Sequence, residues 1–416
     1  MKLFVGIDVS SEKLDTCYLT DEMVVLLNHT YGNDTQGAWE LKEQILSFHE
    51  TYSFDQIVIG MESTSMYSYH PAVNFHQDEQ LQAIHAITTI ENPHRIKQYM
   101  KMFDADKTDP IDAFMIADYL RIQRYTNSPI KGEKYMALQR LTRTRYQIVR
   151  QLVEVKQHFI ENLSYKCNTL KKELREAEGS TTVFSAAIMD IFTQDLSLDD
   201  LANLPLKDLA EWLQSKGRGR FKDPEGLAKT IQRAVRSSYR LDQVMSESID
   251  MILGILVREI RSLEKAVKDC DQGIEDLVQT VPEYQCLTSI PGVGPVYAAG
   301  LLAEIGQIER FPDQTSLAKY AGLTWPKHQS GRHEAENTPL TKKGNRYFRY
   351  YLIEAANSVS RHLPEYQAFY RKKYQETPKH QHKRALVLTA RKFVRLVDTL
   401  LRNHQLYTPP RSVIEK

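Results

Sequence analysis

Two apolar runs near the N-terminus each carry one carboxylate, and this placement limits how the chain can fold. Asp8 lies within FVGIDVSS, and Glu62 ends the run IVIGME. A third acidic segment, KTDPIDAFMIADYL, holds Asp109 and Asp112 at the start of a helical pattern. Short apolar runs of this kind are typical of buried strands. The pattern therefore favours a fold in which two strands and one helix start bring their acids to a shared pocket.

Converging carboxylates are suited to a divalent cation. Mg²⁺ (or Mn²⁺) prefers oxygen ligands and keeps its remaining positions for water or phosphate oxygens. Two such ions can bind the attacking and leaving oxygens of a phosphodiester. The first hypothesis is therefore phosphoryl transfer on nucleic acid. The expected metal ligands, which are also the expected catalytic acids, are Asp8, Glu62, Asp109 and Asp112.

Each acid also has a structural interpretation. An Asp at a strand end can cap the next turn, and a Glu there can be solvated. Asp109 is placed as a helix N-cap, with Pro110 at the first helical position. Residues three apart on a helix share a face, with Cβ atoms roughly 5–6 Å apart, so Asp109 and Asp112 can reach one cavity. Capping and metal binding are compatible for Asp109.

At 416 residues the chain is long enough for two or three domains, and its 42% hydrophobic content supports real cores. No apolar stretch reaches the roughly 18–20 residues that span a bilayer, so no membrane association is expected. MKLFVGIDVS runs directly into a strand, with no visible signal peptide. The cysteines are scattered, which indicates reduced thiols in a cytoplasmic protein. They are Cys17, Cys167, Cys270 and Cys286.

Charge is distributed unevenly, although the formal net charge is only +1. From Thr341 to Lys416 there are 17 Lys and Arg residues against 5 Asp and Glu residues. A basic region beside an acidic remainder is typical of a chain that binds a polyanion in one part and metal in another. The alternative is a solvated basic surface.

Residues 1–126 alternate between strand and helix patterns and predict a mixed α/β sheet. LFVGIDVS, TCYLT and MVVLLNHT predict a hairpin-rich start. We expect helices over 34–50 and 110–125, and strands over 56–62 and 81–89.

From about residue 133 the pattern becomes helical, with two long periodic runs. The first run has steps of three, four or seven, and the second has steps of three and four over more than four heptads, which is typical of a coiled-coil seam. The two helices can pair with each other or with a second subunit, and we expect a homo-oligomer, either a dimer or a tetramer. The stretch over about 180–240 interrupts the runs and is expected to be a small helical insertion. The first run is Leu141, Ile148, Leu152, Val155, Phe159 and Leu163, and the second is Met245, Ile249, Ile252, Leu256, Ile260, Leu263, Val267, Cys270, Ile274 and Leu277.

The segment LTSIPGVGPVYAAGLLAEIG predicts two helices joined by a glycine-containing turn. Gly292 and Gly294 would let backbone N–H groups approach a phosphate, and the following helix N-terminus favours an anion. A tight turn without a ligand is the equal alternative.

Three segments together resemble the DEDD transposases of the IS110 insertion sequences, whose relatives are the Piv-type DNA invertases. They are GIDVSSEKLD, KTDPIDA, and the pair IPGVGPVYAAGLLAEIG and AGLTWPKHQSGR…TKKGNRYFR. The resemblance implies a RuvC/ribonuclease H-like metal-binding domain over 1–126, a coiled-coil linker over 127–284, and a mainly helical transposase domain with a helix-hairpin-helix over 285–416.

The resemblance also implies roles for single residues. Asp8, Glu62, Asp109 and Asp112 would be the DEDD ligands, and Ser330 would be a nucleophile that forms a transient 5′-phosphoserine link. It further implies a structured guide RNA that pairs with donor and target DNA, and a site composed of two subunits.

The surroundings of Ser330 are consistent with a nucleophile. A serine hydroxyl attacks phosphorus only when its proton is taken and cations stabilise the developing charge. His328 and His333 are possible proton acceptors, although roles in a solvated loop are the simpler interpretation of both. The cations expected to bind nucleic acid are Lys327, Arg332, Lys342, Lys343, Arg346 and Arg349.

Three other functions fit parts of the sequence. A junction-resolving nuclease would use only the four acids, metal and water. A tyrosine recombinase would use a tyrosine of RHLPEYQAFYRKKY. A non-catalytic dimeric protein would bind nucleic acid through its basic tail, with the acids structural.

Overall fold

The computed structural model describes residues 1–63, 66–103, 109–123, 125, 132–177, 181–193, 196–325, 329–330, 333–334, 340–341 and 343–409. The chain divides into two compact units, Met1–Gly132 and Glu133–Lys416. The predicted three-domain division stays a prediction.

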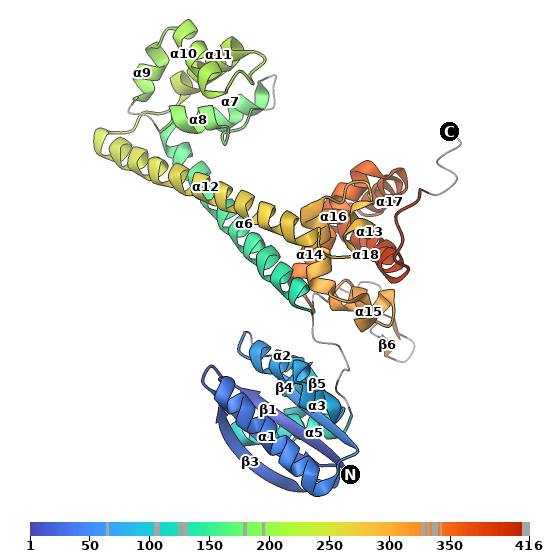
Figure 1. Cartoon of the computed structure of the whole chain (residues 1–416). Helices are drawn as coiled ribbons and strands as arrows, with labels where there is room; N and C mark the ends of the chain where they lie inside the picture. The colour runs from blue at the N-terminus through green and yellow to red at the C-terminus, as the bar shows by residue number, and fades with distance from the viewer. Residues whose placement is uncertain are drawn as a thin grey trace. The chain divides into compact units, whose positions relative to one another are not determined.

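The first unit is built on a five-stranded mixed sheet with the order β3-β2-β1-β4-β5, which confirms the predicted α/β sheet (Figure 1). The first three strands form antiparallel hairpins, and β4 and β5 run parallel to β1. The strands are β1 Lys2–Val9, β2 Lys13–Thr20, β3 Val25–Gly32, β4 Gln56–Glu62 and β5 Ile87–Glu91.

Helices cover both faces of this sheet. One face packs against α1, α2 and α3, with Ile7, Ile59 and Leu41 in the shared core. The other face packs against α4 and α5, through smaller clusters that include Phe4 and Leu120. The strands β1, β2 and β4 therefore alternate between two cores, which explains their largely apolar character. The helices are α1 Thr35–Tyr52, α2 Tyr69–Gln77, α3 Glu79–Ala83, α4 Pro93–Met100 and α5 Asp109–Arg121.

The strand predicted over 81–89 was wrong in its first half. Its first three residues belong to α3, and β5 begins only at Ile87. Asp78 caps α3, because its carboxylate accepts hydrogen bonds of 3.0 Å from the N–H groups of both Gln80 and Leu81. His85 then turns the chain with a φ of 55°. A local cap thus overrides the apolar pattern.

In the second unit, α6 Glu133–Lys166 and α12 Gln243–Val278 pack along one another (Figure 1). Ion pairs between them run in opposite sequence directions: Arg145 with Asp271, Lys156 with Glu264 at 2.7 Å, and Lys166 with Asp250 at 2.6 Å. The pair is therefore antiparallel. The two periodic runs lie together within one chain, whereas a coiled coil with a second subunit stays a prediction.

The segment between these helices forms a helical insertion with its own core, which includes Phe159 and Leu253 of the long helices and Ile231 of the insertion. It lies at the end of the helix pair formed by the C-terminus of α6 and the N-terminus of α12 (Figure 1). Its helices are α7 Leu170–Glu176, α8 Ala186–Ile191, α9 Leu198–Asn203, α10 Leu206–Lys216 and α11 Pro224–Ser237.

The C-terminal region packs on the other end of the helix pair, and its core includes Leu138 and Ile274. Among the described residues, no helix is both long and apolar enough to cross a membrane. The elements are α13 Tyr284–Thr288, α14 Pro295–Ile305, η1 Ile308–Arg310, α15 Gln314–Tyr320, β6 Gln329–Ser330, β7 His333–Glu334, α16 Arg346–His362, α17 Pro364–Gln375 and α18 Gln381–Arg402.

Gly6 of β1 lies directly beneath α5. A Cβ atom there would lie 2.3 Å from both the Ala113 carbonyl oxygen and the Ala117 backbone nitrogen. Gly6→Ala should therefore push α5 away and destabilise the first unit by about 1–3 kcal/mol. Faster hydrogen exchange of the β1 and α5 amides would measure this effect.

The control is Gly254→Ala in α12, where the nearest neighbour of an added Cβ is 3.9 Å away. An Ala at this helical position should be neutral or stabilising. Unchanged protection of β1 and α5 in Gly6→Ala would contradict the packing described.

Candidate active site

Asp8 and Glu62 lie at the carboxyl ends of two adjacent parallel strands. Gly6 pairs with Gly60 and Ile7 with Met61 in the register of β1 and β4. Asp8 and Glu62 are the next residues along each strand, and both are half-buried. The sheet therefore places these two acids side by side.

Both acids are on the face of the sheet that α5 covers. Side chains alternate along a strand, so Asp8 shares a face with Phe4, and Glu62 shares one with Val58. Phe4 and Val58 pack against Leu120 of α5. Ile7 and Met61, which alternate with the acids, pack in the opposite core.

The direction of α5 brings its first turn towards Asp8. Ala113 lies over Gly6, and Leu120, two turns later, packs with Phe4 further back along β1. The helix thus runs antiparallel to β1, and its N-terminus points to the carboxyl end of that strand. Asp112, in this first turn, is half-buried. Three predicted acids from three elements therefore lie at one edge of the sheet.

The fourth predicted ligand is only partly described. Asp109 begins α5, but its side chain lies outside the described residues. Within the described part of the chain, no group of three or more His, Cys, Asp or Glu side chains is arranged to hold a metal ion. Oxygen donors at one edge are the right chemistry for Mg²⁺, whereas metal ligation by these four acids stays a prediction.

Sequence reasoning missed a further acid at the same edge. Glu91 ends β5 and pairs with Glu62 in the parallel register, so the two share a face. Its side chain is 1% exposed and accepts a hydrogen bond of 2.8 Å from the Thr89 hydroxyl. A signal was present, because ITTIE is a β-branched run, typical of a strand, that ends in an acid.

The backbone of Ser330 lies in a short hairpin of the second unit, where β6 pairs with β7 and Ser330 opposes His333. The side chains of both residues lie outside the described part of the chain, as do Lys327, His328, Arg332 and Lys342. Lys343 is described and exposed. The predicted roles of these residues stay predictions.

The segment that follows the hairpin is fixed by a buried network around Glu304. This carboxylate is fully buried and accepts hydrogen bonds of 2.7 and 2.8 Å from the Arg143 guanidinium and 2.6 Å from the Asn345 amide. Asn345 also caps α16 by accepting hydrogen bonds from the N–H groups of Tyr347 and Phe348. Charge-assisted bonds of this kind fix geometry strongly. The network therefore ties the start of α16 to α14 and α6.

Arg346 and Arg349 follow this cap and differ in their surroundings. Arg346 is exposed and lies over the Tyr347 ring at 4.8 Å, and its hydrogen bond to the Tyr347 hydroxyl lowers the pKa of that tyrosine. Arg349 donates a 2.9 Å hydrogen bond to the Ala321 carbonyl, and burial lowers its pKa. Arg346 is thus the more accessible of the two cations.

The two predicted phosphate-binding glycines also differ. Gly292 has a φ of +95°, and a Cβ there would lie 2.8 Å from His362 Nδ1, so its missing side chain lets the turn pack on α16. Gly294 caps α14 and has open space where a Cβ would stand. Phosphate binding by either glycine stays a prediction, as does the helix-hairpin-helix.

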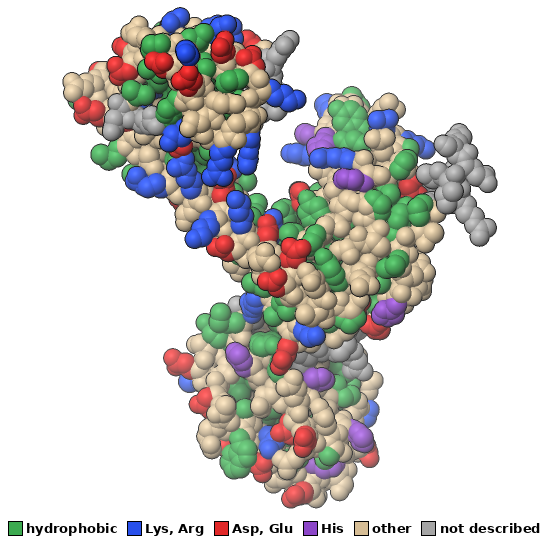
Figure 2. All heavy atoms as spheres, turned by 45° about the horizontal axis from the view of Figure 1, so that its top comes forward, with side chains coloured by type: hydrophobic (Ala, Val, Ile, Leu, Met, Phe, Trp, Pro, Cys, Tyr) green, Lys and Arg blue, Asp and Glu red, His purple; other side chains and the backbone are tan. Residues whose placement is uncertain are grey.

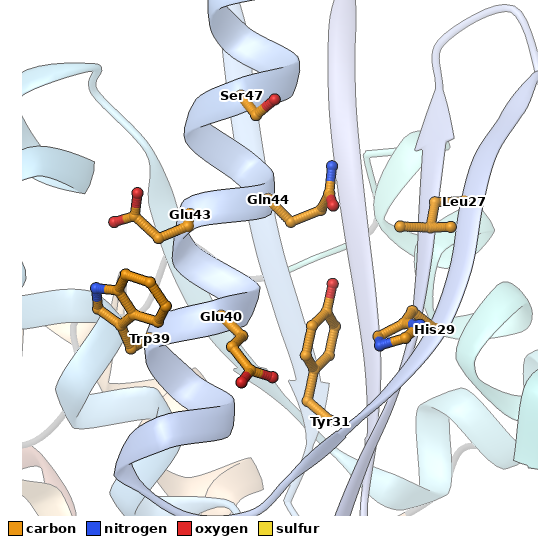
Figure 3. Close-up of a pocket in the computed structure, with 8 residues that line it drawn as sticks. All are labelled: Leu27, His29, Tyr31, Trp39, Glu40, Glu43, Gln44 and Ser47. Carbon is orange, nitrogen blue, oxygen red and sulfur yellow. The ribbon is translucent and has the colours of Figure 1, made fainter.

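A separate cavity of about 540 Å³ lies between β3 and α1 (Figure 3). Figure 3 shows Tyr31 and His29 of β3 opposite Glu40 and Gln44 of α1. Tyr31 packs in the core on the α1 side of the sheet. The acids lie on the α5 side, so this cavity is not part of the candidate site.

Two family models match the chain. One, described as a transposase of the DEDD IS110 type, matches residues 5–167, and the other, the transposase IS116/IS110/IS902 family, matches residues 284–371. The first region contains the acids and α5, and the second contains Ser330.

Several relatives are similar over most of their length. A protein of insertion element IS116 from Streptomyces clavuligerus is 25% identical over 74% of each chain. The mini-circle putative transposase for IS117 from Streptomyces coelicolor is 25% identical over 83% of each chain. The pilin gene-inverting protein of Moraxella lacunata is 23% identical over 90% of this chain and 88% of its own.

The fold and the matched regions define an insertion-sequence transposase or recombinase, a class that rearranges DNA. The chain belongs to the IS110 family of these transposases, which confirms the resemblance found in the sequence. The DEDD match also implies that the mixed sheet is RuvC-like.

Proposed function

We propose that this chain cuts and rejoins DNA through a phosphoserine intermediate, with help from a divalent metal ion. The observation that carries the proposal is the convergence of Asp8, Glu62 and the first turn of α5 at one edge of the sheet. A structural role requires no such convergence of acids from three elements. Site-specific transposition or inversion are both compatible with this chemistry.

Asp8, Glu62, Asp109 and Asp112 would hold Mg²⁺ or Mn²⁺. When bound, the ion supplies charge that stabilises the phosphoryl transition state. The protein's part is positional: β1 and β4 hold two acids in register, and α5 would supply Asp109 and Asp112 from its first turn. Packing of α5 on Gly6 leaves little freedom in that arrangement.

Ser330 would attack the scissile phosphorus with its Oγ. The new bond joins Ser330 Oγ to the 5′-phosphate, the bond from phosphorus to the 3′-oxygen breaks, and a 3′-hydroxyl strand leaves. The serine proton passes to a base, for which His333 is the neighbour paired with Ser330 in the hairpin. That base or a water molecule donates a proton to the leaving 3′-oxygen. Attack by another 3′-hydroxyl restores the serine and rejoins the strands, so no net hydrolysis occurs.

The partners in this reaction would be donor and target DNA, a guide RNA and further copies of the chain. Gly292, Gly294, Lys327, Arg332, Lys342, Lys343, Arg346 and Arg349 are the proposed nucleic-acid contacts. Of the described cations, Lys343 and Arg346 are exposed, as phosphate contacts require. Binding through them should weaken as salt rises. The metal site of one subunit would act beside the serine of another.

A junction-resolving nuclease is the alternative that shares the acidic edge. It would leave Ser330 idle and produce free ends. The match of residues 284–371 to a transposase family favours recombination, because it covers the serine-containing region.

Asp109→Asn keeps the shape of the side chain and removes its charge. We expect strand exchange between donor and target DNA to fall by at least about 100-fold, because the metal ion loses one carboxylate ligand. Folding, followed by circular dichroism, and DNA binding, followed by fluorescence anisotropy, should persist. Recombination at the wild-type rate would contradict the assignment of the four acids.

Ser330→Ala should abolish the covalent protein–DNA adduct while metal binding persists. The adduct is measured by denaturing electrophoresis with 5′-labelled and 3′-labelled DNA strands. The wild-type protein should retain only the 3′-end label, because the fragment joined to the serine through its 5′-phosphate carries that label. An adduct that survives in Ser330→Ala would show that another residue is the nucleophile, and cleavage with no adduct in wild type would favour the nuclease.

A further inference from the structure

The helical insertion carries a face of α11 that the proposed reaction does not use. Residues 168–283, which include this helix, lie outside both family matches. The sequence from Gly226 to Leu241 contains four cations and no acid. They are Lys229, Arg233, Arg236 and Arg240.

The cations of α11 are segregated from its core-facing residues. Leu227, Ile231 and Val235 are buried in the insertion core. Lys229, Arg233 and Arg236 recur at steps of four and three and are exposed, which places them on one helical face. The exposed surface of the neighbouring α10 instead mixes signs, as in the pair of Lys207 with Glu211 at 3.9 Å. From Lys229 to Arg236 the face of α11 therefore has one sign of charge, whereas its first turn holds the acid Glu225.

The exposed face of α11 borders a cavity, and hydrogen bonds to backbone carbonyls hold two of the side chains that line it. A cavity of about 410 Å³ is lined by Lys229, Gln232, Arg233, Arg236, Ser237 and Leu206. Gln232 donates a 2.7 Å hydrogen bond to the Leu204 carbonyl, and Arg236 donates one of 2.8 Å to the Ala202 carbonyl. A guanidinium has five N–H donors, so this bond orients Arg236 and leaves donors for a ligand.

Two cations of the face have no acidic partner in the part of the chain that the structure describes. Arg233 pairs with Glu173 at 2.5 Å, and Arg240 pairs with Asp199 at 2.9 Å. Among the described residues, no carboxylate lies within ion-pair distance of Lys229 or Arg236. Figure 2 shows Lys and Arg side chains on the insertion and along the long helices beneath it. An anion at the cavity would therefore meet uncompensated positive charge.

An exposed aromatic residue, Tyr239, follows the last residue of α11 by two positions in the chain. Tyr239 is 83% exposed, and its backbone N–H donates a 3.3 Å hydrogen bond to the Asn168 side chain. Exposed aromatic rings beside cations that track a backbone are typical of surfaces that bind single-stranded nucleic acid, because every base can stack on them. A duplex offers no unstacked base to such a ring.

We infer that the α11 face, formed by Lys229, Arg233, Arg236, Ser237 and Tyr239, binds a single-stranded segment of nucleic acid. Lys229 and Arg236 contact its phosphates at the cavity, and Tyr239 stacks on an unpaired base. The inference is independent of the phosphoserine chemistry and predicts that binding persists in Ser330→Ala. DNA and RNA single strands present the same phosphates and bases, and the experiment separates them.

The test uses the full chain and labelled oligothymidylate, oligouridylate and duplex DNA of equal length. Lys229→Gln with Arg236→Gln should weaken single-strand binding and reduce the slope of log K against log salt by roughly 1.4, about 0.7 for each lost phosphate contact. Tyr239→Ala should weaken it by roughly tenfold. The matched control, Lys207→Gln with Lys216→Gln on α10, loses the same charge and should leave affinity and slope unchanged.

Because other basic surfaces contribute to affinity, cross-linking locates the contact. Oligonucleotides containing 4-thiothymidine or 4-thiouridine should cross-link to the peptide that spans residues 229–240. Cross-links with one oligonucleotide alone identify DNA or RNA as the ligand. No cross-link in this peptide, equal effects of the α10 control, or a loss confined to duplex DNA would each overturn the inference.

Discussion

The arrangement of the acidic edge depends on one contact, the close approach of α5 to β1 at Gly6. No side chain separates the two elements there, so the helix backbone lies against the strand. At Gly60 the contact is instead with a side chain, since a Cβ there would be 2.6 Å from Cδ1 of Leu120. Two glycines side by side in the β1–β4 register thus leave space for α5 to pack closely on the sheet. This packing of α5 on the two glycines fixes the position of Asp112 relative to Asp8 and Glu62.

In the second unit, two long helices connect the region that contains the β6–β7 hairpin with the helical insertion at the opposite end of the helix pair. The ion pairs between α6 and α12 set their antiparallel register. At one end, Glu304 joins α14, Arg143 and Asn345 within a buried network. Breaking a buried charge pair of this kind is costly, about 3–5 kcal/mol, since one charge is left without its partner. The start of α16 is therefore held on a rigid frame.

Much of this architecture could be predicted from the sequence where pattern and local signals agree. The hairpin strands, the strand that ends in Glu62 and the two long helices follow directly from their periodicity. The first half of the strand expected over 81–89 was wrong because Asp78 caps a helix that the apolar pattern does not reveal. Glu91 was missed because its proximity to Glu62 depends on the parallel pairing of β4 and β5, a non-local fact. The packing role of Gly292 against His362 was likewise invisible, since the two residues are distant in sequence.

The central claim is that the ends of β1 and β4 and the start of α5 meet around one metal ion. Iron-mediated cleavage tests it most directly, because Fe²⁺ in a magnesium site generates hydroxyl radicals that cut only the nearby backbone. We expect fragments ending near residues 8, 62 and 109–112 in the same sample, suppressed by excess Mg²⁺ and absent in Asp8→Asn. Cuts at only one of these segments, or none at any of them, would contradict it.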